Sequence, residues 1–133
     1  MFKVVLDTNI LVSSLLTSGP PAAIVDLIAG GRIIPFYSNM ILEEYHDVLS
    51  RKKFGFSHLQ VARLINDLVN AGIAAIDKPS IKSKNKKVDE DDRVFYDVAA
   101  EAQAYLVTGN IRHFPAEPFI VTPARFLTIY RNI

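Results

Sequence analysis

Five short apolar runs alternate along the chain with longer segments whose apolar residues recur at helical spacing. The runs predict strands at 3–6, 33–37, 73–76, 105–108 and 119–121. The intervening segments predict helices at 10–16, 21–29, 38–53, 57–72, 91–103 and from 123 onward, with a polar, Lys-rich loop at 78–90. Strands that alternate with helices predict a mostly parallel sheet covered on both faces, an α/β fold with three layers.

Local signals fix several helix ends in this pattern. Ser38 is a predicted N-cap, Ser57 and Gln60 have the spacing of a capping box, and Thr122-Pro123 combines an N-cap with a proline at the first helical position. Gly30-Gly31 stops the helix that precedes it. These signals support the helical segments independently of the apolar pattern.

Length and composition narrow the class of protein. A chain of 133 residues, half of them apolar, suits a single folded domain over 1–133. The absence of Cys excludes a disulfide scaffold, a zinc ribbon and a cysteine nucleophile. With 15 basic and 14 acidic residues the net charge is +1, so any polyanion must be bound by a local cluster of charge.

The first 16 residues resemble a secretory signal only superficially. Asp7, Thr8 and Asn9 interrupt the apolar stretch that a signal requires to be continuous. No run approaches the roughly 20 apolar residues of a membrane helix. We therefore expect a cytoplasmic protein with no membrane partner.

Two carboxylates occupy positions in the apolar pattern that predict burial. A buried charge is costly unless it is paired, hydrogen-bonded or bound to a metal. Asp7 ends the first strand, at the edge where parallel sheets bind ligands, although Asp7 or Asn9 could simply cap the next helix. Glu44 lies four residues after Met40 and four before Val48, in the apolar stripe of its helix. The alternative for Glu44 is an edge position or a salt bridge to a basic neighbour.

A third carboxylate, Asp92, repeats the pattern. Phe95, Ala99 and Ala102 follow it on the same helical face, so Asp92 is predicted to point inward. The alternative is a simple favourable interaction with the helix dipole. Asp97 lies well off this line and is either a supporting acid or a surface charge.

The fourth strand also ends in a polar cluster, Thr108-Gly109-Asn110. If the strand order is 3-2-1-4-5, this cluster faces Asp7 across a crevice that Glu44 and Asp92 could close. Three acids with further oxygen donors suit Mg²⁺ or Mn²⁺. His46, His58 and His113 lack zinc spacing, and His113 is predicted to be a loop residue beside Phe114.

These motifs, in order and over nearly the whole chain, resemble the PIN-domain family. Val5 to Asn9 resembles its first acidic motif, Ile41 to Leu49 its second, with Glu44 at the acidic position, and Asp92 followed by Leu106 to Asn110 its third and fourth. Ile120 to Leu127 is similar to the ending of a branch described as toxin components of toxin–antitoxin pairs.

The resemblance implies a PIN-like sheet of about five strands in the order 3-2-1-4-5 and a metal-dependent ribonuclease (a hydrolase). Within it, Mg²⁺ or Mn²⁺ would be held by the four acids, and Thr108 and Asn110 would position water or phosphate while Asn9 orients Asp7. The catalytic set is Asp7, Glu44, Asp92 and Asn110; the metal set is Asp7, Glu44, Asp92 and Asp97. Many members carry Asp where this chain has Asn110, and Asn lacks the charge, so metal affinity is expected to be lower.

An acidic site that cleaves RNA needs cations nearby to hold the backbone. The candidates are Lys52, Lys53, Lys82, Lys84, Lys86, Lys87, Arg93 and Arg112. Each of them could equally be an ordinary solvated charge. The resemblance further implies an antitoxin partner and a homodimer.

Two other functions remain open at this stage. The chain could be a nucleic-acid-binding module with weak or lost catalysis, as Asn110 suggests. It could also be a phosphatase with Asp7 as nucleophile, which is disfavoured because Asn9 stands where such enzymes usually place a second acid.

Overall fold

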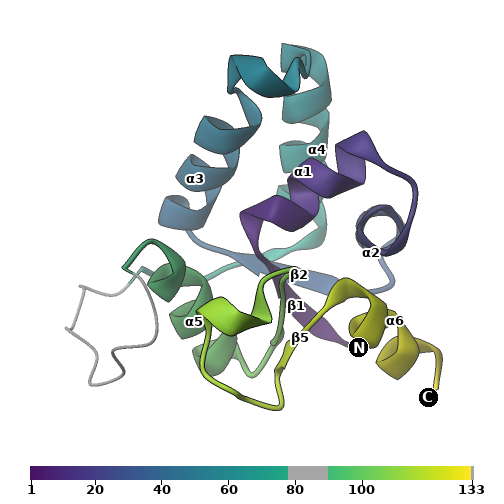
Figure 1. The fold of residues 1–133 in the computed structure, drawn as a ribbon, viewed down its shortest axis with the longest axis vertical. Coiled ribbons are helices and arrows are strands. Elements are labelled where there is room, and N and C mark those ends of the chain that lie inside the picture. The colour runs from purple at the N-terminus through teal and green to yellow at the C-terminus, as the bar shows by residue number, and fades with distance from the viewer. Residues whose placement is uncertain (78–89, 133) are drawn as a thin grey trace.

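The computed structural model describes residues 1–77 and 90–132, arranged as helices on both sides of a central sheet (Figure 1). The elements in chain order are β1 (Lys3–Leu6), α1 (Thr8–Leu16), α2 (Pro20–Ala29), β2 (Ile34–Tyr37), α3 (Asn39–Leu49), the 3₁₀ turn η1 (Lys52–Phe54), α4 (His58–Ala71), β3 (Ile73–Ala74), α5 (Glu90–Ala102), β4 (Tyr105–Val107), the 3₁₀ turn η2 (Ile111–His113), β5 (Ile120–Val121) and α6 (Pro123–Arg131).

The five strands form one parallel sheet in the order β3-β2-β1-β4-β5, as predicted. Strands β1 and β4 are neighbours, with Leu6 opposite Val107. Asp7 and Thr108 each come one residue later, so the two polar side chains leave the sheet next to each other. The strand order itself therefore assembles the polar cluster at the carboxyl edge.

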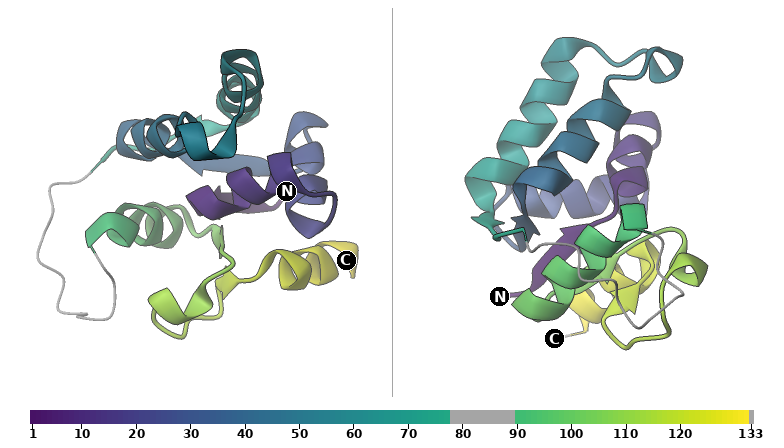
Figure 2. Two further views of the ribbon diagram at one scale, coloured as in Figure 1. Left: turned by 45° about the horizontal axis from the view of Figure 1, so that its top comes forward. Right: turned by 90° about the vertical axis from the view of Figure 1, so that its left-hand side faces the viewer.

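The helices are divided unequally between the two faces of the sheet. Figure 1 shows α1, α3 and α4 on one side and α5 on the other, and Figure 2 shows the same division from two further directions. Helices α3 and α4 pack against each other and project away from the sheet as a pair, which we call the arm.

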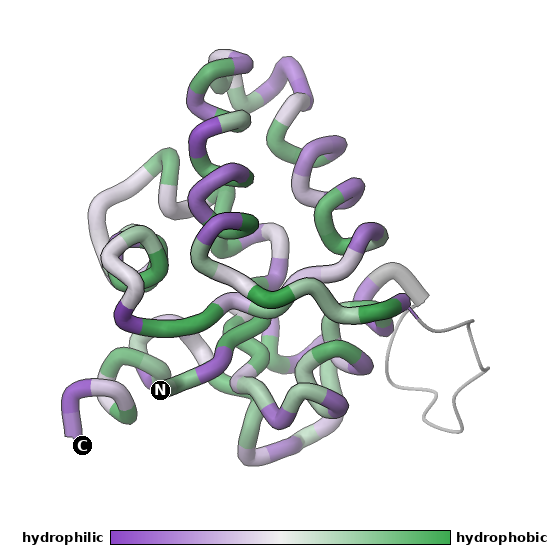
Figure 3. The backbone as a smooth tube through the Cα atoms, turned by 180° about the vertical axis from the view of Figure 1, so that it is seen from behind, coloured by the Kyte–Doolittle hydropathy of each residue, from purple (hydrophilic) through white to green (hydrophobic). Residues whose placement is uncertain are grey.

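The core lies where the strands meet the inward-facing sides of the helices. Figure 3 shows the hydropathy of each residue along the chain, with hydrophobic residues in the strands and on the helices around them. Tyr45, Phe95 and Phe126 are the largest of the fully buried side chains. At Gly72 the backbone comes so close to β2 that a Cβ would lie 2.5 Å from the Pro35 carbonyl oxygen, which explains a glycine at the end of α4. The order of strands and helices thus rests on ordinary apolar packing.

Most predicted elements agree with the structure to within two residues, and the capping box at Ser57 and Gln60 is confirmed. The helix predicted for 38–53 is wrong at its end, because α3 stops at Leu49. Arg51 is extended (φ −67°, ψ 134°), and Gly55 adopts a left-handed conformation (φ 68°) after η1. The basic and aromatic residues that looked like a continuation of the helix therefore form a turn at the end of the arm.

Among the described residues no single helix is long and apolar enough to cross a membrane. Helices α1 and α2 reach that length and composition only as a pair, and they are bent by 100° relative to each other.

Candidate functional site

Asp7 lies at the end of β1 and is 7% exposed. Its backbone occupies the N-cap position of α1, but its carboxylate makes no capping hydrogen bond to that helix. The carboxylate instead accepts a hydrogen bond from the hydroxyl of Thr108, with Oγ1 2.8 Å from Oδ2. The interpretation of Asp7 as a helix cap is therefore wrong for its side chain, which is directed toward the end of β4.

Thr108 is fully buried and connects two parts of the cluster. Its hydroxyl donates to Asp7 and accepts from the backbone N–H of Asn110, whose nitrogen lies 3.0 Å from Oγ1. Because both bonds converge on one oxygen, the turn after β4 is held in register with the end of β1. The expected supporting role of Thr108 has a direct geometric basis.

Burial raises the pKa of Asp7 above its ordinary value of 3.8, and this effect exceeds those that oppose it. The opposing effects are the Thr108 hydrogen bond, the backbone N–H of Thr8 and the charge of His113. When ionised, Asp7 is thus a buried negative charge that the protein compensates only in part. A cation at this carboxylate would be favourable for the same reason.

Glu44 reaches the cluster through Thr8, a buried residue whose hydroxyl donates to Glu44 Oε2. The buried ridge of α3 is Ile41, Tyr45 and Leu49. Met40 is 53% exposed, so the stripe predicted from Met40 to Val48 is displaced by one residue. Glu44 therefore lies at the half-buried edge of that ridge and faces the start of α1.

Tyr45 fixes this edge of α3 to the sheet. It is buried, and its hydroxyl donates to the carbonyl oxygen of Leu6, the residue before Asp7. Burial and then the charges of Asp7 and Glu44 raise the pKa of Tyr45 well above its ordinary value. The phenol therefore stays a hydrogen-bond donor, and its response to both carboxylates indicates that Asp7 and Glu44 lie in the same neighbourhood.

Asp92 lies in the first turn of α5 with its carboxylate next to His113. The nitrogen Nδ1 of His113 is 3.8 Å from Asp92 Oδ2, and the Asp92 side chain is only 23% exposed. His113 also acts electrostatically on Asp7, so it stands near both acids. His113 lies in the turn η2 directly before Phe114, as the predicted loop position implied, but Phe114 is buried whereas the His113 side chain is 58% exposed and lies next to Asp92. No motif spacing in the sequence could have shown this contact.

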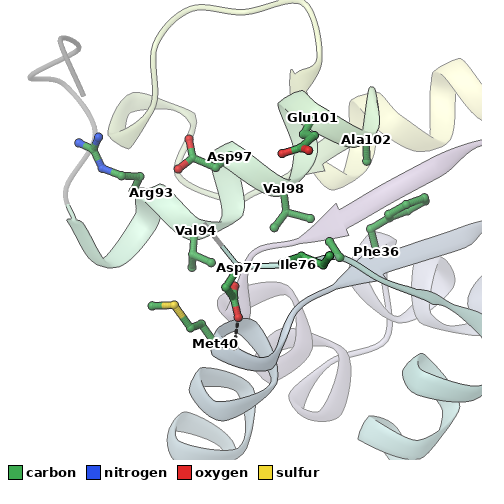
Figure 4. A pocket seen from close by; sticks show the side chains of 11 residues that line it. Phe36, Met40, Ile76, Asp77, Arg93, Val94, Asp97, Val98, Glu101 and Ala102 are labelled. Carbon is green, nitrogen blue, oxygen red and sulfur yellow. Dashed lines mark hydrogen bonds between the residues drawn. The ribbon is translucent and has the colours of Figure 1, made fainter. Parts of the chain in front are cut away.

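Two other predicted site residues line a pocket along α5. Asp97 lines this pocket of about 270 Å³ together with Arg93 and Glu101, which lie one turn away on either side of Asp97 along the helix (Figure 4). Phe36, Ile76 and Val98 line the same pocket. The expected metal ligand Asp97 and the expected RNA contact Arg93 therefore share a pocket whose described lining does not include Asp7.

The remaining candidate residues are exposed or lie outside the described residues. Asn9 is exposed on α1, and Asn110 and Arg112 are exposed at and after the end of β4. Lys52 and Lys53 are exposed in η1. Lys82, Lys84, Lys86 and Lys87, with most of the loop predicted at 78–90, lie outside the described residues.

The donor chemistry of the cluster fits a hard divalent cation. Asp7, Glu44 and Asp92 offer carboxylate oxygens from β1, α3 and α5, and Mg²⁺ and Mn²⁺ prefer such ligands. Within residues 1–77 and 90–132, however, no three His, Asp or Glu side chains are grouped closely enough to hold a metal ion. The cluster thus has suitable ligand types without a preformed cage.

Comparison with known proteins places this chain in a family. A family model described as "PIN domain" matches residues 3–112, which include β1 to β4 and the cluster residues Asp7, Glu44, Asp92 and Thr108. The chain is also 33% identical over 112 residues to an uncharacterized protein of Methanocaldococcus jannaschii, a match that covers 81% of this chain and 70% of that protein. The chain belongs to the PIN-domain family, whose members are generally nucleases.

Proposed function

We propose that this protein is a Mg²⁺- or Mn²⁺-dependent endoribonuclease that hydrolyses RNA phosphodiester bonds and serves as the toxin of a toxin–antitoxin pair. The observation that carries the proposal is the buried carboxylate of Asp7, held by Thr108 at the ends of two adjacent parallel strands. Burial raises its pKa, so the ionised form requires a positive partner. A PIN-domain nuclease provides a reason to keep so unfavourable a group.

In this proposal each residue has a task that follows from its contacts. Asp7 and Asp92 would hold the cation, while Thr108 keeps the Asp7 carboxylate in one orientation. Glu44, positioned by Thr8, would bind the cation or accept a hydrogen bond from the attacking water. When bound, a divalent cation polarises the scissile phosphate and lowers the pKa of a bound water.

His113 and Asn110 stand at the edge of this arrangement. In this proposal His113, whose Nδ1 lies 3.8 Å from Asp92 Oδ2, would donate a hydrogen bond to a phosphate oxygen. The backbone N–H of Asn110 donates to the Thr108 hydroxyl, and this hydrogen bond holds the Asn110 backbone next to Thr108. The Asn110 amide would then position water or phosphate without adding a charge.

The toxin role and the antitoxin rest on the motif from Ile120 to Leu127, which is similar to one branch of the family, and a homodimer is proposed because relatives often form dimers. A toxin would arrest growth when it is expressed without its antitoxin. Arrest that disappears in Glu44→Gln would support this role, and unimpaired growth with active soluble enzyme in the cell would contradict it.

The test of the reaction is cleavage of an end-labelled single-stranded RNA with MnCl₂, with MgCl₂ and with EDTA. We expect cleavage only with metal, and a loss of about 10²-fold or more in Glu44→Gln. Glu43→Gln is the matched control, because Glu43 is the exposed neighbour on the same helix. Cleavage that survives EDTA, or equal activity of the two variants, would overturn the proposal.

Two observations favour a second function, an RNA-binding module with weak catalysis. The described residues contain no ready group of three metal ligands, and Asn110 stands where many relatives carry Asp. Under this alternative the wild type binds RNA without turnover, and Asn110→Asp gains metal-dependent cleavage. If the wild type cleaves and Asn110→Asp does not improve it, the alternative is excluded.

A further inference from the structure

The distal half of the arm carries a local excess of positive charge. Residues 48–66 contain Arg51, Lys52, Lys53 and Arg63 and no Asp or Glu, a formal charge of +4 in a chain of net +1. Three of these cations are consecutive and exposed at the turn between α3 and α4. We call this turn, residues 50–57, the arm tip.

The arm tip is built as an ordered turn. Gly55 in the left-handed region reverses the chain after η1, and the rings of Phe54 and Phe56 stack at 5.5 Å with an interplanar angle of 10°. The ammonium group of Lys53 lies 5.1 Å from the centre of the Phe54 ring. Ser57 then caps α4, so the lysines are displayed on a fixed backbone between two helices.

The charge of the tip lies mainly on its two lysines. Arg51 pairs with Asp47 one helical turn earlier, at 3.5 Å between Nη2 and Oδ2, so part of its charge is balanced locally. Such an exposed pair is weak, but it places an acid beside Arg51. Lys52 and Lys53, both exposed, follow at the outermost part of the turn.

The same helix connects the arm tip to the candidate site. Glu44 lies five residues before the end of α3, and at roughly 1.5 Å per residue the tip begins about 10 Å beyond it. Along the axis of a stacked nucleic-acid strand, successive phosphates advance by about 3.4 Å. A stacked strand that runs parallel to α3 with one phosphate at Glu44 therefore reaches the tip after roughly three further phosphates.

We propose that Lys52 and Lys53 of the arm tip bind the RNA backbone about three phosphates away from the bond that is cleaved. The inference rests on the proposed function for its substrate, and it adds a second contact region outside the acidic cluster. It also accounts for a nuclease of near-zero net charge: the acids that would collect the cation and the lysines that would hold the backbone are two separate local clusters, which α3 and the turn after it connect.

The test measures RNA binding in EDTA, so that it does not depend on catalysis. The affinity of a fluorescent 12-nucleotide single-stranded RNA is followed by anisotropy from 50 to 200 mM NaCl for the wild type and for Lys52→Ala/Lys53→Ala. Each lost phosphate contact lowers the slope of log K against log salt by about 0.7, so we expect a decrease of about 1.4. The matched control is Arg125→Ala/Arg131→Ala, which removes two exposed charges from α6, away from the arm (Figures 1 and 2).

A slope that decreases in the lysine variant and not in the arginine variant supports the inference. Equal slopes in the wild type and the lysine variant overturn it, as does an equal decrease in both variants, which would reflect net charge alone. Equal slopes in the wild type and the lysine variant are also expected if the arm tip binds an acidic protein segment instead of RNA.

Substrate length separates this inference from the proposed function. We expect Lys52→Ala/Lys53→Ala to lower kcat/KM severalfold on the 12-nucleotide RNA and to leave it unchanged on a dinucleotide. Cleavage with equal sensitivity on both substrates overturns the inference while the nuclease stands. Absence of any cleavage, with the salt slope still dependent on the lysines, overturns the nuclease while the RNA contact stands.

Discussion

The amino and carboxyl ends of the neighbouring strands β1 and β4 are closed by different kinds of side-chain contact. At the amino end, Phe2 and Tyr105 pack edge to face with centroids 5.9 Å apart, and Phe126 and Tyr130 of α6 complete a cluster of four rings. At the carboxyl end, Asp7 and Thr108 meet through one hydrogen bond, with further carboxylates around them. One end is closed by aromatic contacts, and the other is closed by polar ones.

This difference separates stability from function within a single pair of strands. Aromatic clusters stabilise a fold through buried area and ring geometry, and nothing in them is reactive. A buried carboxylate with a raised pKa opposes folding at neutral pH. The two ends should therefore respond differently to substitution: the amino end in the free energy of unfolding, and the carboxyl end in activity.

The largest expected effect is on activity, at Asp7. We expect Asp7→Asn to lower kcat by about 10³-fold or more, because the neutral amide cannot compensate a cation in a buried site. The amide oxygen can still accept the hydrogen bond from Thr108, so the fold is retained. RNA cleavage in MnCl₂ measures the loss. Asp26→Asn on α2 is the control, and full activity in Asp7→Asn would remove Asp7 from the site.

The same substitution should stabilise the protein, with a definite dependence on pH. The folded-state pKa of Asp7 is raised, so the unfolded chain releases this proton at a lower pH and the stability of the wild type falls as pH rises above about 3.8. At pH 7 without metal we expect Asp7→Asn to gain about 0.5–2 kcal/mol. The gain should vanish at about pH 2.5, well below the ordinary value of 3.8, where both states are protonated. Urea unfolding at the two pH values measures it, and an equal difference at both would contradict the burial argument.

At the amino end the expected effect is on stability alone. Phe126 is fully buried and contacts the rings of Phe2, Tyr105 and Tyr130. We expect Phe126→Ala to cost about 3–5 kcal/mol in urea unfolding. The activity of the molecules that remain folded should equal that of the wild type. If the alanine variant does not fold, the milder Phe126→Leu allows stability and activity to be measured. A lower kcat in the leucine variant would show that the two ends are coupled.

Local patterns in the sequence were sufficient for the elements and for the acids. The apolar run that ends at Leu6 predicted a buried strand, which is confirmed, and Asp7 is conspicuous because it ends that strand. The pairing of β1 with β4 then brings Asp7 to Thr108, 101 residues away. The expected strand order is confirmed, and with it the expectation that Asp7 and Thr108 lie together.

Contacts that depend on side-chain direction could not be predicted in this way. Helical spacing placed Asp97 off the inward-facing line of Asp92 without assigning it a surface. Only the three-dimensional arrangement shows that Asp97 shares a pocket with Arg93 and Glu101. His113 approaches Asp92 from the turn after β4, a contact that no periodicity encodes. The end of α3 was wrong for a related reason: Arg51 has good helix propensity, yet the turn that Gly55 allows overrides it.

The smallest expected effect on activity tests how the carboxyl end is held together. Thr108→Val keeps the shape of a buried side chain and removes the hydroxyl that donates to Asp7 and accepts from Asn110. The loss of one buried hydrogen-bonding group should cost about 1–3 kcal/mol in unfolding. It also removes a contact that lowers the pKa of Asp7, so this pKa rises further and the acid limb of the pH profile of kcat/KM moves to higher pH.

Thr108→Ser retains the hydroxyl and should restore the wild-type pH profile even where packing is imperfect. Thr128→Val is the matched control, since it removes an exposed threonine hydroxyl that is bonded only within α6. If Thr108→Val loses stability with an unchanged pH profile, the hydroxyl holds the fold without tuning Asp7. If serine restores the profile and Thr128→Val leaves it unmoved, the carboxyl end depends on one hydrogen bond between adjacent strands, as the amino end depends on its rings.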